Sequence, residues 1–160
     1  MRVGIGHDTH RLVEGRPLIL AGVRIEHPLG LFGHSDADVV MHTVADALLG
    51  AAGLGDIGEH YPDTDPQWAG LDGSVLLSDV LRRVADRGWQ PVNCDVIVHA
   101  QQPKLSRFKP AMRANLANLL GLAVEAVNIK AKTGENVGPI GRSEAISCEA
   151  VVLLKHADPA

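Results

Sequence analysis

The sequence predicts a mixed α/β fold, of the α+β kind, built as a single domain over residues 1–160. Two observations carry this prediction: segments with strand and helix periodicity alternate along the chain, and neither a repeat nor a low-complexity linker divides it. A chain of 160 residues buries roughly two-thirds of the surface that its unfolded state exposes. The chain is therefore long enough to fold around one hydrophobic core without disulfides.

Hydrophobic periodicity and turn residues place the elements in order. Met1 to Leu12 and Pro17 to Ile25 read as two extended segments around a turn at residues 14–16. A helix follows inside residues 34–65 and ends in the segment Gly50 to Gly58. The later elements are a helix over Gly73 to Arg87, a strand over Val92 to His99, a helix over Lys109 to Leu120, a strand over Val127 to Ala131 and a strand over Ala145 to Leu154.

The helix inside residues 34–65 carries both a core face and a polar stripe. Ser35 or Asp36 can cap its start. Asp38, His42 and Asp46 follow one another at intervals of four, so the histidine lies on one stripe between two carboxylates. We expect Asp38 or Asp46 to orient the imidazole of His42. The core face consists of Val39, Val40, Thr43, Val44, Ala47 and Leu48.

Composition excludes several classes of partner. The formal charge of −4 provides no basic field, and two Trp, one Tyr and two Phe are too few for a base-stacking platform, so we expect no nucleic-acid partner. No apolar run approaches the ~20 residues of a membrane helix, and Arg2 to Ile5 is strand-like rather than part of a signal peptide. Cys94 and Cys148 lie in apolar runs and predict buried free thiols. We therefore expect a cytoplasmic protein with no membrane partner.

Asp8, His10 and His42 form a candidate metal site. Asp8 and His10 are two residues apart in the first strand, so their side chains leave the same face and can meet His42. One carboxylate and two imidazoles suit Zn²⁺ and leave a fourth tetrahedral position open, as in catalytic sites. The pattern alone also fits an accidental D-x-H pair and a solvated or buried histidine.

Three later segments carry groups that suit phosphate. Ala100 to Leu105 and Lys130 to Glu135 each follow a predicted strand, where α/β sheets often bind ligands. Lys132 and Thr133 can donate to phosphate oxygens, and Glu135 can hold a hard cation such as Mg²⁺. The glycine-rich turn Gly138 to Glu144 contains Arg142, which can clamp an anion or pair with Glu144 or Glu149. Solvated loops with local charge pairs are the alternative.

Together, six motifs in order and register closely resemble the 2-C-methyl-D-erythritol 2,4-cyclodiphosphate synthase family of the non-mevalonate isoprenoid pathway. The resemblance spans essentially the whole chain. The motifs are GHDTH, HSDADVVMH, GDIGEHYPDTD, AQQPKL, KAKTGE and GRSEAISCEAV. The chain departs from the family's usual residues at Lys132, Pro139 and Ser143.

The resemblance implies an architecture, a reaction and cofactors. The implied subunit has a mixed, four-stranded-type sheet covered by helices on one face, and three sheets face the axis of a homotrimer whose active sites lie between neighbours. The implied enzyme is a phosphorus-oxygen lyase that converts 4-diphosphocytidyl-2-C-methyl-D-erythritol 2-phosphate to a cyclic diphosphate and CMP. Zn²⁺ on Asp8, His10 and His42 and Mg²⁺ or Mn²⁺ on Glu135 are the implied ions.

The resemblance also assigns the remaining site residues. His34 and Thr133 take the positions of transition-state stabilisation, and Ser35 belongs to a loop that contacts substrate. Asp56, Ile57 and Gly58, with the segment that contains Tyr61, Asp63 and Asp65, correspond to the methylerythritol region. The cytidine and phosphate pocket corresponds to Ala100 to Ser106, including Pro103, Lys104 and Leu105, and to Ala131, Lys132 and Thr133; Pro139 and Arg142 are further candidate contacts.

Two other functions use the same residues. A zinc-dependent phosphoesterase acting on nucleotide diphosphates would need the same open metal position, but it would activate water and release an uncyclised product. A non-catalytic, trimeric metal-binding protein would account for Asp8, His10 and His42 but not for the phosphate-type loops. The identity of the product separates these possibilities.

Overall fold

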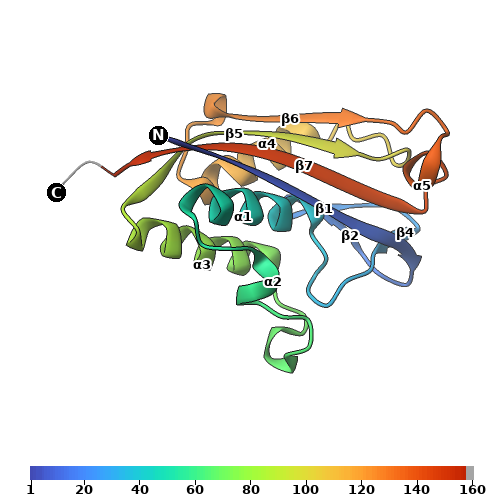
Figure 1. Cartoon of the computed structure of the whole chain (residues 1–160). Helices are drawn as coiled ribbons and strands as arrows, with labels where there is room; N and C mark the ends of the chain where they lie inside the picture. The colour runs from blue at the N-terminus through green and yellow to red at the C-terminus, as the bar shows by residue number, and fades with distance from the viewer. Residues whose placement is uncertain (158–160) are drawn as a thin grey trace.

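A five-stranded mixed sheet forms one layer of the computed structural model, which describes residues 1–157 (Figure 1). The pairing of β5 with β6 is parallel, and the other pairings are antiparallel. A separate hairpin joins β2 (Leu18–Leu20) to β3 (Val23–Ile25). The strand order in the sheet is β4 (Leu29–Leu31), β1 (Arg2–Glu14), β7 (Ala145–His156), β5 (Trp89–His99) and β6 (Val127–Lys132).

Three long helices pack on one face of this sheet: α1 (Val39–Ala52), α3 (Gly73–Asp86) and α4 (Lys109–Leu120) (Figure 1). One hydrophobic core fills the space between the layers. No helix within residues 1–157 combines the length and the apolar character that crossing a bilayer requires. The short elements are α2 (Ile57–His60), the 3₁₀ turns η1 (Pro66–Trp68) and η2 (Val124–Ala126), and α5 (Gly138–Gly141).

Helix α1 lies directly on β1 because the strand has no side chains at two contact positions. A Cβ atom built at Gly4 would lie 1.9 Å from the carbonyl oxygen of Ala47, and one at Gly6 would lie 2.0 Å from that of Thr43. Successive residues of a strand point to opposite faces, so Gly4, Gly6, Asp8 and His10 all face the helix layer. Asp8 and His10 therefore lie on the same side of β1 as the two glycines that contact α1.

The start of α1 is fixed by Asp38 rather than by Ser35 or Asp36. The fully buried Asp38 carboxylate accepts hydrogen bonds from the backbone N–H groups of Val40 and Met41, as an N-cap does. It also accepts from Ala21 at 2.9 Å and Gly22 at 2.6 Å, at the tip of the β2–β3 hairpin. One buried carboxylate thus joins the central helix to a segment distant in sequence.

Most predicted elements are confirmed, and the differences lie in the short strands. The helix predicted over Lys109 to Leu120 has these bounds, and it ends at Gly121 with φ 66°. The segment Pro17 to Ile25 is not one extended strand but a hairpin that turns at Ala21 and Gly22. The sheet has five strands instead of four because the three-residue β4 pairs with the end of β1.

Replacing Gly6 with alanine is expected to lower the free energy of unfolding by about 3 kcal/mol, because the new methyl group overlaps the backbone of α1. Chemical denaturation followed by circular dichroism, at one protein concentration, measures the change. Gly50→Ala is the matched control, since a Cβ there meets nothing within 4 Å and is expected to stabilise the helix by about 0.5–1 kcal/mol. Equal stabilities of the two variants would contradict the close contact.

Candidate metal centre

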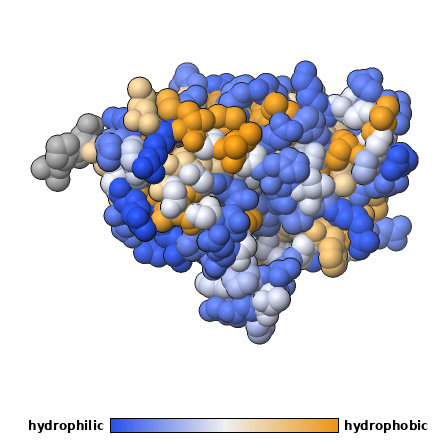
Figure 2. Space-filling view, viewed as in Figure 1, coloured by the Kyte–Doolittle hydropathy of each residue, from blue (hydrophilic) through white to orange (hydrophobic). Residues whose placement is uncertain are grey.

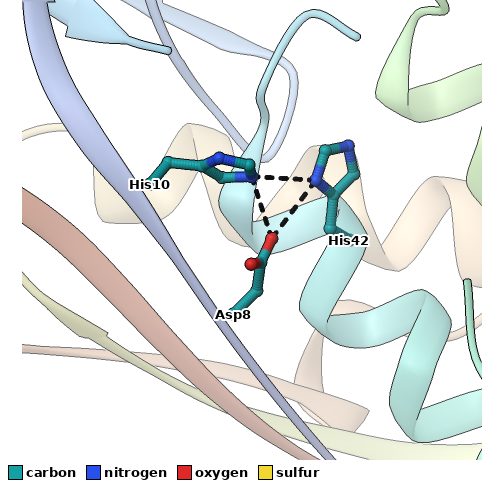
Figure 3. A group of neighbouring side chains, drawn as sticks. All are labelled: Asp8, His10 and His42. Carbon is teal, nitrogen blue, oxygen red and sulfur yellow. Dashed lines mark hydrogen bonds and ion pairs between the residues drawn. The ribbon is translucent and has the colours of Figure 1, made fainter. Parts of the chain in front are cut away.

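Asp8, His10 and His42 converge at the junction of β1 and α1 (Figure 3). The Oδ2 atom of Asp8 lies 2.9 Å from Nε2 of His10 and 3.3 Å from Nδ1 of His42. The two ring nitrogens are 3.1 Å apart. Three potential ligand atoms, from two strand residues and one helix residue, therefore face a common point.

The outward-facing nitrogen of each imidazole has its own partner. Nδ1 of His10 lies 3.0 Å from the carbonyl oxygen of Phe32, which only accepts, so this nitrogen carries the proton. Nε2 of His42 lies 2.9 Å from Oγ of Ser35, which also accepts from the N–H of Ala37. Because Nδ1 of His10 keeps its proton, Nε2 of His10 is the nitrogen that can turn a lone pair to a cation at the common point. The Ser35 hydroxyl can both donate and accept, and it holds the outer nitrogen of His42 in place.

Electrostatics favours positive charge at this point. Burial raises the pKa of Asp8, but the hydrogen bonds from His10 and His42 outweigh it and hold that pKa well below its usual range. Burial lowers the pKa of His10, but the hydrogen bond and negative charge of Asp8 produce a net rise. A carboxylate and two imidazole lone pairs at these distances repel one another unless a proton or a cation lies between them.

The donor set and its spacing fit a tetrahedral divalent ion. Ligand atoms bound about 2.0–2.1 Å from a tetrahedral Zn²⁺ are about 3.3 Å from one another. The three separations between these ligand atoms are 2.9, 3.1 and 3.3 Å. Asp8, His10 and His42 would provide three ligands and leave the fourth position to a bound molecule.

The expectation that Asp38 or Asp46 orients His42 is wrong. Asp38 points to the hairpin and the helix start, as described above. The Oδ1 atom of Asp46 accepts the N–H of Ile57 at 2.8 Å and so connects α1 to the start of α2. Helical spacing placed the three side chains on one stripe, but backbone N–H groups from other segments bind both carboxylates. Ser35 is the residue that contacts the outer nitrogen of His42.

A cavity of about 790 Å³ opens beside the three ligand candidates. Six residues with predicted substrate contacts or catalytic roles line it: His34, Ser35, Ile57, Gly58, Tyr61 and Asp63. Sequence reasoning missed its apolar wall, which consists of Phe32, Trp68, Leu71 and Leu76. Trp68 stands three residues after Asp65 in a chain with few aromatics, and this proximity was the available signal.

Asp56 and Asp65 cap helices outside the cavity lining. The side chain of Asp56 accepts the N–H of Glu59 at the start of α2. The side chain of Asp65 accepts the N–H of Gln67 at the start of η1, and its carbonyl oxygen lies 3.3 Å from Nε2 of His34. Both carboxylates therefore shape the loops around the cavity.

The phosphate-type loops meet at the ends of β5 and β6, but none of their residues lines this cavity. The N–H of Ala100 donates to the carbonyl of Lys132 at 2.8 Å, and the hydroxyl of Thr133 donates to Glu135 at 2.8 Å. The Leu105 side chain is buried in the core, so only its backbone faces the loop. Pro103, Lys104, Ser106 and Ala131 are at least partly accessible in the same two loops.

The turn that follows carries a local ion pair. Arg142 donates to Glu144 at 2.7 Å through Nε, so its partner is Glu144 and not Glu149. Pro139 lies in the first turn of α5 and is exposed. Arg142 is exposed as well, which leaves its guanidinium accessible to an anion.

Comparisons with known proteins agree over the whole chain. Residues 1–155 match the YgbB family. A Bordetella avium protein named 2-C-methyl-D-erythritol 2,4-cyclodiphosphate synthase is 60% identical over 153 residues, which cover 96% of this chain and 94% of that protein.

Two solved structures share the fold. The bifunctional IspDF from Campylobacter jejuni superposes with a TM-score of 0.94 at 46% identity; the match covers 98% of this chain and 42% of that longer one. A 2C-methyl-D-erythritol-2,4-cyclodiphosphate synthase in its CDP-bound form superposes with a TM-score of 0.89 at 40% identity, covering 96% of this chain and 100% of that chain.

His42→Ala is expected to abolish stoichiometric Zn²⁺ binding while the fold survives, because it removes one of three ligands. Ser35→Ala keeps all three ligands and removes the Oγ contacts to Nε2 of His42 and to the N–H of Ala37, so Zn²⁺ affinity is expected to fall about 10–100-fold. Isothermal titration and elemental analysis measure both effects. His27→Ala is the control, since His27 bonds only to Leu29. A zinc-replete His42→Ala protein would contradict the assignment.

Proposed function

Because this chain belongs to the YgbB family, we propose that it converts 4-diphosphocytidyl-2-C-methyl-D-erythritol 2-phosphate to 2-C-methyl-D-erythritol 2,4-cyclodiphosphate and CMP. It is thus a cyclising, CMP-releasing lyase of isoprenoid precursor biosynthesis. The observation that carries the proposal is the convergence of Asp8, His10 and His42 beside a cavity large enough for a small phosphorylated substrate. Relatives named for this reaction match 96% and 97% of the chain.

The proposed reaction is an intramolecular phosphoryl transfer. An oxygen of the 2-phosphate attacks the β-phosphorus, the bond from that phosphorus to the bridging oxygen breaks, and CMP leaves with the electron pair. The attacking oxygen is already ionised near neutral pH, so no general base is required. Catalysis then depends on alignment of the two phosphates and on neutralising their charge.

The proposed ions are Zn²⁺ at Asp8, His10 and His42 and Mg²⁺ or Mn²⁺ at Glu135. When bound, they would supply positive charge beside the two phosphates as these approach each other. The chain's own part is to hold the ligand atoms: the carbonyl of Phe32 keeps His10 in the metal-binding tautomer, Ser35 contacts the outer nitrogen of His42, and Thr133 bonds to Glu135.

The remaining groups divide between the two ends of the substrate. His34 and Ser35, which line the cavity, would contact the reacting phosphates, and the wall that includes Ile57, Gly58, Tyr61 and Asp63 would hold the methylerythritol part. The loops Ala100–Ser106 and Ala131–Thr133, largely through backbone groups, would hold cytidine and its phosphates, with Thr133 stabilising the transition state.

In a homotrimer, the residues proposed to bind the two ends of the substrate would meet at a boundary between subunits. The cytidine-type loops do not line the cavity of their own chain, so a neighbour's loops would complete it. The sheet face opposite the helices also carries exposed apolar side chains, among them Val3, Ile5 and Val151, and Ile5 lies directly opposite Val151. Figure 2 shows apolar surface over this part of the sheet, near the N-terminus. Such a patch suits burial against other subunits.

A cytoplasmic location accompanies the proposal. Cys94 and Cys148 are buried and unpaired. Burial raises the pKa of the Cys94 thiol to about 12. Unreactive free thiols of this kind are typical of proteins in a reducing compartment.

The purified protein with substrate, Zn²⁺ and Mg²⁺ is expected to release CMP together with a cyclic diphosphate in a ³¹P NMR time course. CMP with only open-chain phosphates would instead indicate the zinc-dependent phosphoesterase, which uses water as nucleophile. An unchanged spectrum from folded, metal-loaded protein would favour a non-catalytic metal-binding protein. Samples without added metal serve as the control.

Val151→Asp is expected to dissociate the trimer, because it places three charges in an apolar contact, and to lower turnover at least 100-fold. Light scattering after size exclusion measures the mass against the 17.0 kDa of one chain. Val75→Asp is the matched control, since Val75 is exposed on α3 in the helix layer. A wild-type protein that is active as a monomer would overturn the proposed assembly.

A further inference from the structure

The segment from Tyr61 to Asp72 connects α2 to α3 and forms one wall of the cavity. Tyr61 and Trp68 both line this cavity, with ring centroids 5.1 Å apart and ring planes at 77°. The segment contains only one short turn, η1, so its position depends on contacts with its surroundings. At its far end, the N–H of Gly70 donates to the carbonyl of His34 at 2.8 Å.

At its near end, the segment is held by the hydroxyl group of Tyr61. This hydroxyl donates to Oδ2 of Asp79, which lies on α3 and does not line the cavity. Nε of Arg83 donates to the same oxygen at 2.8 Å, and its guanidinium lies 5.9 Å from the centre of the Tyr61 ring. Arg82 bonds to the other oxygen of Asp79. The Tyr61 ring therefore faces the cavity while its polar end is fixed to a long helix.

The charges in this cluster keep the hydrogen bond formed over a wide pH range. Partial burial raises the pKa of Asp79, but hydrogen bonds from Tyr61, Arg83 and Arg82 lower it to about 2. Burial and the bond to Asp79 raise the pKa of Tyr61 to about 12. At neutral pH, Asp79 is thus an ionised acceptor and Tyr61 a neutral donor, which makes a charge-assisted hydrogen bond.

We propose that Asp79 is a positioning residue for the substrate pocket: through the Tyr61 hydroxyl it holds the aromatic wall of Tyr61 and Trp68 against α3. The inference rests on the proposed function, because it assigns this wall to substrate binding. Asp79 is neither among the residues that line the cavity nor among the metal ligands, so its effect on the pocket passes through Tyr61, directly and through the Arg83 guanidinium beside the Tyr61 ring. The wall contacts the part of the substrate that does not react, and it therefore contributes to binding in the ground state and the transition state alike.

Steady-state kinetics separate positioning from general stability. Tyr61→Phe and Asp79→Ala are each expected to raise KM about 5–10-fold, with kcat within about 2-fold of wild type and with unchanged Zn²⁺ content. The double variant is expected to have the KM of Asp79→Ala, because Asp79→Ala already removes the bond to Tyr61 together with the bonds from Arg82 and Arg83. A purely structural role would instead lower the active fraction, and hence kcat, at constant KM.

Asp86→Asn is the matched control. Asp86 lies on the same helix and pairs with Arg82 at 3.6 Å, but Tyr61 is not among its partners, so KM is expected to stay at the wild-type value. Single variants with wild-type KM, or single effects that multiply in the double variant, would overturn the proposal.

Fluorescence of Trp68 tests the same bond without turnover. The chain has two tryptophans, and Trp89 does not line the cavity but contacts His156 and Arg2. In a Trp89→Phe background, Asp79→Ala is expected to shift the Trp68 emission to longer wavelength as the wall loosens. Unchanged emission would overturn the positioning role even if the enzyme is active. Shifted emission in a protein that forms no CMP would refute the proposed function while supporting the contact between Asp79 and the wall.

Discussion

The close contact between β1 and α1 determines where the candidate metal centre lies. Gly4 and Gly6 remove the side chains that would separate strand from helix, so the backbones approach closely. The next residues on the same face of β1 are Asp8 and His10, and α1 places His42 beside them. The residues that pack against α1 and the residues that can bind a metal therefore follow one another along the same face of β1. Because the helix is buried nearly all round, it has little freedom to move away from the ligand atoms.

Neutral groups, and not further charged residues, hold the imidazole rings of the candidate ligands in place. The carbonyl of Phe32 fixes the tautomer of His10, the hydroxyl of Ser35 contacts the outer nitrogen of His42, and neither adds net charge to the centre. The single ligand carboxylate, Asp8, supplies the negative charge. One carboxylate with a divalent ion leaves an excess of positive charge, which suits anionic phosphates near the fourth position. The nearby carboxylates of Asp38 and Asp46 accept hydrogen bonds from backbone N–H groups, so they stabilise the fold and supply no ligand to the metal centre.

Sequence patterns predicted the elements whose signals are local, and missed those that depend on distant partners. The glycine after α4 and the alternation along β7 are local, and both gave correct assignments. The three-residue β4 has no periodicity of its own and exists because β1 is long enough to pair with it. The grouping of Asp8, His10 and His42 followed from two spacings and a resemblance. The contact of Asp38 with Ala21 and Gly22 could not be predicted, because these residues belong to a hairpin that the patterns read as one strand.

Strand β1 carries two sets of residues that alternate one by one. Its inward residues fit α1 and the metal centre, and its outward residues, such as Val3 and Ile5, belong to the open sheet face. A substitution alters one set at one position. An insertion or deletion of a single residue before Asp8 would exchange the sets beyond it, turning the Asp8 carboxylate outward and the His7 or Thr9 side chain toward α1. Over evolutionary time, this strand is therefore expected to vary in composition but hardly in length.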